Sequence, residues 1–252
     1  MSCPSKGPRL LLLQHQSQRH QAAMFGIAEV AIQALWHPFT TRSNLTIKYD
    51  GCNIIDVMTL VPTKKELSHA RIVDVAARAI RRSGYRGVGV ADIMKEAGLT
   101  HGGFYAHFDS RDALVVEAMA RAGQENLDAL SDAIERRVRK GESRFRALVE
   151  TYLHDAHMER SENGCVIAAL ASEMARQTDT MREEARQRVQ AMIKLVRSTL
   201  PQSSPQSAAS VITATMVGAL QMSRTLSGSA GRKILAQTRQ ALLGLYDSST
   251  HH

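Results

Sequence analysis

The amino-acid sequence predicts an all-α fold, with a three-helix head at about residues 64–110 and a larger helical body at residues 111–252. Three observations predict it. After Pro62, apolar residues recur at the three- and four-residue spacing of amphipathic helices, as in the run from Ile72 to Ile80. Short segments rich in glycine, proline and serine separate these runs. The alternating pattern of a β-strand is absent after Pro62, and helices without strands make an all-helical protein.

The composition is that of an ordinary globular protein with a basic balance. Of 252 residues, 44% are hydrophobic and 22% are charged, and no stretch approaches the roughly 18 apolar residues of a membrane-spanning helix. The cysteines, Cys3, Cys52 and Cys165, are odd in number and far apart, so we expect a reducing, cytoplasmic location and no membrane partner. The net charge of +8 suits a polyanionic partner, although it is spread along the chain. Aromatic residues, at 4%, are too few to stack single-stranded bases.

Capping residues and glycines predict where the helices begin and end. Thr63 and Glu66 have the spacing of a capping box, which starts a helix, and Gly84 is a suitable stop for it. Thr180 and Glu183 repeat that spacing at a later helix start. The other predicted helices cover about residues 90–97, 101–108, 111–138, 144–158, 166–177, 181–200, 206–227 and 233–246. The predicted breaks lie at Gly98, Asp109–Ser110, Lys140–Gly141, Ser161 to Gly164, Thr178 to Thr180, Pro201 to Pro205, and Gly228 to Gly231.

Residues 88–108 have the pattern of a helix-turn-helix. A first amphipathic helix ends at Gly98, and a second helix begins shortly afterwards with Thr100 in position to cap it. Phe104 and Phe108, four residues apart, are expected to face inward and to hold the second helix on the first. The outward residues of the second helix are polar or small and include no carboxylate, as a helix that lies in the major groove requires.

The same stretch resembles the TetR/AcrR family of transcriptional regulators. The resemblance is carried by GY at 84–85, ADI at 91–93, AG at 97–98, THGGFYAHF at 100–108 and SRDAL at 110–114. It covers residues 66–121 in detail, and residues 122–252 through the number and lengths of the helices. The resemblance implies a sequence-specific transcriptional regulator, a repressor by expectation, that binds double-stranded DNA.

The resemblance also implies roles for individual residues. Thr100, His101 and Gly103 fall where recognition-helix side chains approach bases and adjacent phosphates. Gly102 falls at a glycine that permits close approach to the DNA, and Tyr105 falls at a tyrosine that contacts phosphate.

Two further residues match the family's interface, and three depart from it. His107 falls at a histidine that meets the DNA backbone or a base edge, and Arg111 falls where a basic residue grips phosphate. Val88 and Gly89 stand where Thr and Ser commonly contact phosphate, and Ala91 stands where an arginine often reads a base. We therefore expect this protein to depend more heavily on its recognition helix.

For the body, the resemblance implies a homodimer built from the helices at 206–227 and 233–246, a pseudo-palindromic operator, and a small-molecule effector that releases the DNA. No cofactor and no metal are expected. The candidate effector-binding or sensing residues are Tyr152, His157, Cys165, Met174 and Met216. Flexible methionines suit an adaptable pocket, although they serve equally well as core residues.

Several other interpretations stay open at this point. Cys165, at the predicted start of a helix, is either a thiol sensor of oxidants or electrophiles or a small buried hydrophobe. His154 and His157 could chelate a metal, but the absence of an obvious third ligand favours a solvated or pocket-lining face. No nucleotide-binding, zinc-protease or hydrolase motif indicates an enzyme. A helical interaction module would differ from a regulator in lacking salt-dependent affinity for duplex DNA.

Residues 1–63 differ in character from the rest of the chain. They show no helix cap joined to apolar periodicity, and their apolar stretch from Ala22 to Trp36 has no evident partner surface. We interpret them as a poorly ordered extension, with Met58, shortly before Thr63, as an alternative start. The rival interpretation is an arm that adds DNA contacts, against which the small basic excess of this segment argues.

Deletion of residues 1–57 distinguishes these interpretations. We expect unchanged operator affinity in fluorescence anisotropy, unchanged mass in light scattering and an unchanged melting temperature, because every predicted functional feature follows residue 57. A loss of operator affinity greater than about tenfold, or ~1.4 kcal/mol, would instead assign this segment a part in DNA binding.

Overall fold

The computed structural model describes residues 48–49, 52–53, 62–87 and 89–247, and the chain divides into two units at Pro62. In the first unit, β1 (Lys48–Tyr49) and β2 (Cys52–Asn53) pair antiparallel. The intervening dipeptide, Asp50–Gly51, is a typical sequence for a two-residue hairpin turn. The interpretation of residues 1–57 as poorly ordered falls almost entirely outside the described residues.

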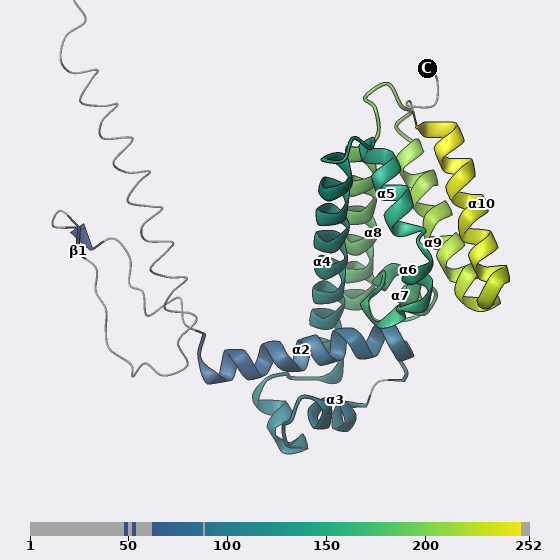
Figure 1. Cartoon of the computed structure of the whole chain (residues 1–252). Helices are drawn as coiled ribbons and strands as arrows, with labels where there is room; N and C mark the ends of the chain where they lie inside the picture. The colour runs from purple at the N-terminus through teal and green to yellow at the C-terminus, as the bar shows by residue number, and fades with distance from the viewer. Residues whose placement is uncertain (1–47, 50–51, 54–61, 88, 248–252) are drawn as a thin grey trace, which may run out of the picture. The chain divides into compact units, whose positions relative to one another are not determined.

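In the second unit every described element is a helix, and the predicted all-α fold class is confirmed (Figure 1). None of the helices in the described part of the chain is long and apolar enough to cross a bilayer. The elements are α2 (Lys64–Ser83), α3 (Val90–Glu96), the 3-10 helix η2 (His101–Ala106), α4 (Arg111–Val138), α5 (Arg144–Tyr152), α6 (Asp155–Glu159), the 3-10 helix η3 (Ser161–Asn163), α7 (Val166–Met174), α8 (Asp179–Thr199), α9 (Ala208–Leu226) and α10 (Gly228–Tyr246).

The predicted capping box starts α2. The Thr63 N–H donates to Glu66 Oε2 at 2.6 Å, and the Glu66 N–H donates to Thr63 Oγ1 at 3.2 Å. Two of the backbone donors at the start of the helix are thereby satisfied. Gly84 ends the helix with φ of 72°, a backbone conformation that favours glycine. The start and the end predicted for this helix are both confirmed.

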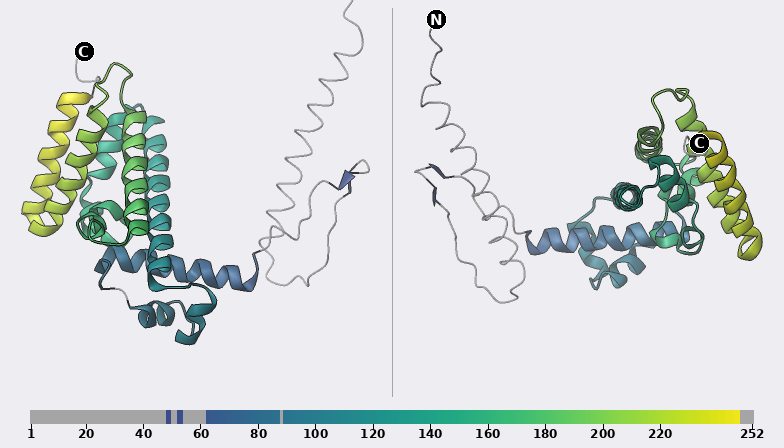
Figure 2. Two further views of the ribbon diagram at one scale, coloured as in Figure 1. Left: turned by 180° about the vertical axis from the view of Figure 1, so that it is seen from behind. Right: turned by 45° about the horizontal axis from the view of Figure 1, so that its top comes forward.

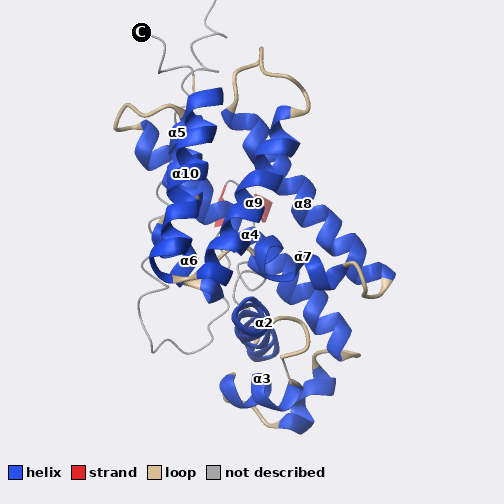
Figure 3. Cartoon of the chain, turned by 90° about the vertical axis from the view of Figure 1, so that its right-hand side faces the viewer, coloured by secondary structure: helices blue, strands red, loops and turns tan. Residues whose placement is uncertain are grey.

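The head consists of α2, α3 and η2, with α2 crossing the lower end of α4 and with α3 and η2 on the far side of α2 (Figures 1 and 3). Helix α2 packs against α3, α4, α7 and η3, and its buried face shares a core with Phe104 of η2. This head core does not close on the head alone, because it also contains side chains from α4 and α7: Leu114, Val115, Ala118, Met119, Ala122, Val166, Leu170 and Met174.

The body is a bundle in which α4, α8, α9 and α10 run alongside one another, with α5, α6 and α7 packed among them (Figures 1 and 2). Its body core draws on α4, α5, α8, α9 and α10, and includes Leu130, Ile134, Leu148, Tyr152, Val196, Ile212, Leu220 and Leu235. Helices α4 and α7 contribute to both cores. The nine-residue α7 does so within little more than two turns: Leu170 and Met174 lie in the head core, and Ala168 lies in the body core.

The prediction of a single helix at 144–158 is wrong in one respect, because the structure has two helices there. Helix α5 ends at Tyr152, and α6 begins at Asp155. His154 caps α6: its Nδ1 accepts a hydrogen bond from the Ala156 N–H at 3.1 Å. A histidine is not a common cap residue, so the sequence carried little signal for this break.

The predicted break from Gly228 to Gly231 is too long. Ser227 and Gly228 make the turn, with φ of 52° and 51°, and α10 runs from Gly228 onward. Gly231 lies inside the helix, where an added Cβ would be 2.3 Å from the Ser223 carbonyl oxygen and 2.9 Å from Met158 Sδ. This glycine therefore permits close packing and does not end a helix.

The second predicted capping box, at Thr180 and Glu183, is wrong as well. Helix α8 begins two residues earlier than predicted, at Asp179, with Thr178 in the cap position and no side-chain capping bond. Instead, the Asp179 carboxylate forms an ion pair with Arg182 within the first turn of the helix.

Candidate nucleic-acid interface

The helix-turn-helix is formed by α3, the turn at Gly98 and η2. Gly98 has φ of 70°, and just after it the Leu99 N–H donates to the Met94 carbonyl oxygen at 2.9 Å. Phe104 and Phe108 are 1% and 3% exposed, and their rings stack with centroids 5.6 Å apart. Their predicted inward orientation is confirmed, and this aromatic contact holds η2 against the head core.

The second element is shorter and tighter than predicted. The sequence predicted a helix at 101–108, whereas the structure has a 3-10 helix from His101 to Ala106. Thr100 occupies the cap position, but its hydroxyl makes no capping bond; its carbonyl oxygen accepts from the Gly103 N–H at 3.0 Å. The Thr100 hydroxyl is therefore not used to cap this helix.

The outward face of η2 is exposed and open. Thr100, His101 and Gly102 are exposed, and 73% of Tyr105 is accessible to solvent. No atom lies within 4 Å of the place where a Cβ on Gly102 would be. Gly103 is half-buried and sits against Met94 and Thr100. The predicted contact residues on this element are thus brought together on one accessible face.

His107 lies at the edge of this face and is supported by a residue that sequence reasoning missed. Its ring is 5.9 Å from the His69 ring, which stacks on Phe108 at 4.5 Å. His69 Nε2 is 2.7 Å from Glu117 Oε2. Burial, and then the neighbouring His69 and Lys65, lower the pKa of His107 below its ordinary value. A pair 48 residues apart in the sequence leaves no local pattern by which His69 could have been found.

Arg111, the first residue of α4, lies against Tyr85. Its guanidinium is 4.3 Å from the centre of the Tyr85 ring and donates to the Tyr85 carbonyl oxygen. The Tyr85 hydroxyl in turn donates to Asp112 Oδ1 at 3.0 Å. Arg111 is therefore held in one orientation where the chain leaves the helix-turn-helix and enters the body.

Three of the candidate residues of the body, Tyr152, His157 and Cys165, lie together, whereas Met174 lies in the other core. Tyr152, Cys165 and Met216 are fully buried in the body core. Met174 belongs to the head core, and His157 is half-buried beside Tyr152, with ring centroids 4.8 Å apart. Burial, and then the adjacent Cys165, raise the pKa of Tyr152 well above its ordinary value.

His157 joins α5, α6 and the start of α7. Its Nδ1 lies 2.7 Å from the Tyr152 carbonyl oxygen, and its Nε2 accepts from the Cys165 N–H at 3.0 Å. A carbonyl oxygen only accepts, so Nδ1 carries the proton and the ring is neutral. Burial lowers the pKa of His157 to about 4, against the opposing effect of the bond to Tyr152.

The backbone at His157 is contacted by a residue of α9. Arg224 Nη2 donates to the His157 carbonyl oxygen at 3.0 Å. A Cβ on Gly164 would lie 2.6 Å from Arg224 Nη2 and 3.1 Å from the His157 ring. A side chain at position 164 would therefore displace the Arg224 guanidinium from this contact.

The Cys165 thiol is 0% exposed, so an oxidant reaches the sulfur only if the first turn of α7 opens. This burial favours the interpretation of Cys165 as a small core residue. Among the residues that the structure describes, no group of three or more His, Cys, Asp or Glu side chains could hold a metal ion.

Fold and site together define a helix-turn-helix DNA-binding protein with a helical body. Residues 72–118 match the family model described as bacterial regulatory proteins, tetR family. Residues 142–230 match the model described as transcriptional regulator LmrA/YxaF-like, C-terminal domain. The chain belongs to the tetR family and is a DNA-binding transcriptional regulator, a family whose members are not enzymes. No curated protein matches the chain.

Solved structures show the same fold at low sequence identity. Escherichia coli NemR in its reduced form is 18% identical with a TM-score of 0.60, over 72% of this chain and 97% of that chain. A TetR regulator from Legionella pneumophila is 20% identical with a TM-score of 0.59, over 74% and 99%. One from Chloroflexus aurantiacus is 20% identical with a TM-score of 0.57, over 72% and 94%.

The depressed pKa of His157 predicts a pH-dependent stability. As the pH falls below about 6.5, His157 becomes protonated in the unfolded chain, whereas in the folded protein it stays neutral until the pH approaches about 4. The stability contribution is therefore complete above pH 6.5 and is lost as the pH falls toward 4. Between pH 7.5 and pH 5 we expect His157 to account for about 2 kcal/mol of the decrease in unfolding free energy.

Urea unfolding of the wild type and of His157→Gln at both pH values measures this contribution. The variant should be less stable at pH 7.5, but its stability should fall less with pH, by about the same 2 kcal/mol. His101→Gln, at an exposed position outside the body core, is the matched control and should follow the wild type. Parallel curves for all three proteins would contradict the assignment.

Proposed function

We propose that the protein is a homodimeric repressor that binds a pseudo-palindromic operator and is released from it by a small-molecule effector. In each half-site, η2 enters the major groove of the DNA. Thr100, His101 and Gly103 approach bases and adjacent phosphates, and Gly102 permits close approach. Tyr105 and Arg111 contact phosphates, and His107 contacts the backbone or a base edge.

The outward face of η2 carries this proposal. It presents an uncommitted Thr100 hydroxyl, an exposed His101 and a Tyr105 that is 73% exposed, without a carboxylate from Leu99 to Phe108. Large aromatic side chains on protein surfaces are usually at least half covered, so an exposed tyrosine beside hydrogen-bond donors is typical of a binding surface. Donors on a slim element match the acceptor-rich major groove and the phosphates beside it.

Arg111 fits a phosphate contact because it is already oriented. Its stacking on the Tyr85 ring reduces the entropy that a flexible side chain loses on binding.

The exposed apolar residues of α9 and α10 support the dimer. Val211, Met222 and Leu226 on α9 are each at least half exposed, and Leu245 on α10 is 75% exposed. Val211 and Met222 are three helical turns apart and lie on one face of α9. Gly218, between them, has nothing within 4 Å of an added Cβ, so the centre of this face is flat. Such a face suits an isologous contact with a second copy.

The sharing of α7 supports release by an effector. One face of α7 packs in the head core through Val166, Leu170 and Met174, and its first residues are held by His157 in the body. A ligand that shifts the body around His157 would also shift side chains on which the head rests. By linkage, DNA would weaken binding of that ligand by the same factor.

Operator variants test the DNA contacts. After selection of the operator from random DNA, His101→Ala should change the preference at one base-pair position by roughly 1–3 kcal/mol, because a base contact is lost. Arg111→Ala should weaken all sequences alike and reduce the slope of log K against log salt by about one unit. Fluorescence anisotropy at several salt concentrations measures both.

Lys194→Ala, an exposed cation on α8, is the control for loss of charge and should leave both quantities unchanged. Uniform loss across operator variants for His101→Ala would move this residue to the phosphate contacts. An unchanged salt slope for Arg111→Ala would show that Arg111 packs on Tyr85 without contacting phosphate.

A double substitution tests the dimer face. Val211→Asp with Met222→Asp places four carboxylates in a two-fold interface, and we expect dimer affinity to fall by at least about 100-fold, or ~2.7 kcal/mol. Analytical ultracentrifugation measures the change, and circular dichroism checks the fold. Leu67→Asp, at an exposed leucine on α2, is the control. A double variant that dimerises like the wild type would place the interface elsewhere.

A further inference from the structure

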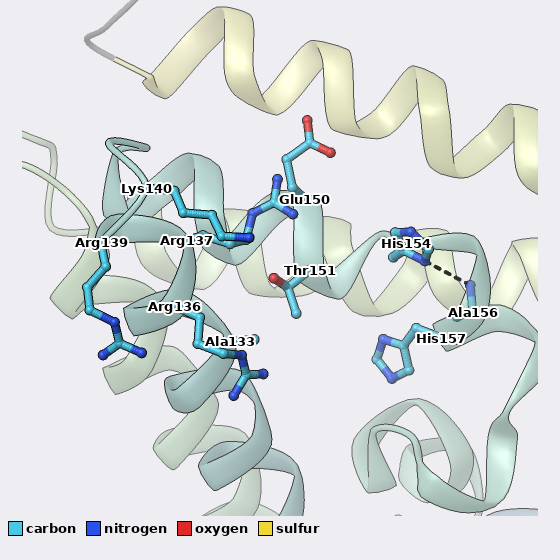
Figure 4. A pocket seen from close by; sticks show the side chains of 10 residues that line it. All are labelled: Ala133, Arg136, Arg137, Arg139, Lys140, Glu150, Thr151, His154, Ala156 and His157. Carbon is cyan, nitrogen blue, oxygen red and sulfur yellow. Dashed lines mark hydrogen bonds between the residues drawn. The ribbon is translucent and has the colours of Figure 1, made fainter.

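A groove of about 580 Å³ lies on the body between the C-terminal end of α4, α5 and α6. Figure 4 shows the side chains of Arg136, Arg139 and Lys140 along one side of it and those of His154 and His157 on the other. The volume is in the range of sites that bind small molecules.

The groove carries positive charge that the fold does not neutralise. Its lining has four cations, Arg136, Arg137, Arg139 and Lys140, and one carboxylate, Glu150. Arg137 pairs with Glu142 at 2.8 Å, and Glu150 lies 3.6 Å from Arg239. Within the described part of the chain, the side chains of Arg136, Arg139 and Lys140 make no ion pair and no hydrogen bond.

The end of α4 does not account for this charge. The C-terminus of a helix is equivalent to about half a negative charge and is stabilised by cations in its last turn, here Arg136 and Arg137. That partial charge is smaller than the combined charge of Arg136, Arg139 and Lys140, and like charges on neighbouring turns repel one another.

DNA bound to the head cannot neutralise these cations either. Helix α4 has 28 residues and begins at Arg111, next to the helix-turn-helix. Its length of roughly 40 Å separates the groove from that end. The partner of the groove is therefore a different anion from the operator.

The opposite wall of the groove adds neutral donors. His154 Nδ1 accepts from the Ala156 N–H, so in the neutral ring the proton is on Nε2 and is available for donation. The Thr151 hydroxyl also faces the groove and makes no hydrogen bond within the described residues. Cations on one wall and donors on the other match the oxygens of a carboxylate or a phosphate.

We propose that this groove binds a small organic anion that carries two or more carboxylate or phosphate groups. The separated cations of α4 hold one anionic group, and Thr151 and His154 hold the other. A regulatory role for this groove rests on the proposed function. His157 provides the link, because it lines the groove and also accepts a hydrogen bond from the Cys165 N–H at the start of α7.

Calorimetric titration of the full-length protein tests the site without DNA. Citrate represents carboxylates and pyrophosphate represents phosphates, both at constant ionic strength, and the neutral trimethyl ester of citrate is the uncharged probe. At least one of the two anions should bind with a one-site isotherm and a Kd below about 1 mM, whereas the ester should bind at least about tenfold more weakly. The stronger anion identifies the preferred group.

The variant Arg136→Gln/Arg139→Gln/Lys140→Gln should lose at least about tenfold in anion affinity. The matched control, Arg176→Gln/Lys194→Gln/Lys233→Gln, removes the same charge from exposed cations outside the groove and should bind like the wild type. Because all six positions are exposed, both triple variants should keep the wild-type circular dichroism. No binding of either anion to the wild type, or equal losses in both variants, would overturn the site.

Operator binding in the presence of the stronger anion then separates this inference from the proposed function. Release of DNA by the anion in the wild type, absent in the groove variant, identifies the groove as the effector site. Anion binding without any change in operator affinity leaves the binding site standing and removes its regulatory part. Loss of operator affinity in the groove variant without any anion would contradict the separation of the groove from the DNA.

Discussion

Sharing of helix α7 between two hydrophobic cores is the constraint on which the rest of this structure depends. The head has too few residues to bury its own apolar surface, and it completes its core with side chains of α4 and α7. Leu170 and Met174 are 1% and 2% exposed there. Each such buried side chain contributes roughly 1.5–3 kcal/mol. The head therefore packs as one unit with α7 and the first half of α4.

The start of α7 is held by polar contacts and not by apolar packing alone. His157 uses both ring nitrogens, one on the Tyr152 carbonyl oxygen and one on the Cys165 N–H. If the ring moves away, the buried N–H of Cys165 loses its acceptor, at a cost of about 1–3 kcal/mol. These two bonds therefore tie the start of α7 to the position of the His157 ring.

The sequence was most informative where one local pattern decides the structure. The capping box at Thr63, the turn at Gly98 and the limits of α4 follow from residues within a few positions of each other. Gly231 was misread because a glycine that allows close packing against Ser223 has the same local signature as one that ends a helix.

Features that depend on long-range pairing could not be predicted at all. His69 supports the interface only because it meets Phe108 and Glu117 in space. The basic groove gathers residues from three helices, and its importance rests on which cations lack partners. In the sequence, Arg136 and Arg137 are neighbouring arginines with nothing to distinguish them. Only the fold shows that Glu142 pairs with Arg137 and not with Arg136.

The recognition element itself has little stability of its own. It is a six-residue 3-10 helix whose cap residue, Thr100, makes no side-chain capping bond. Isolated elements of this length are unstable in water. Its conformation is imposed by the stacked Phe104 and Phe108 and, behind them, by His69 on α2. Phe104 and Phe108 belong to the same head core as Leu170 and Met174 of α7. In the proposed mechanism, a change in the body that shifts α7 would therefore alter the face offered to DNA without touching any of the proposed contact residues.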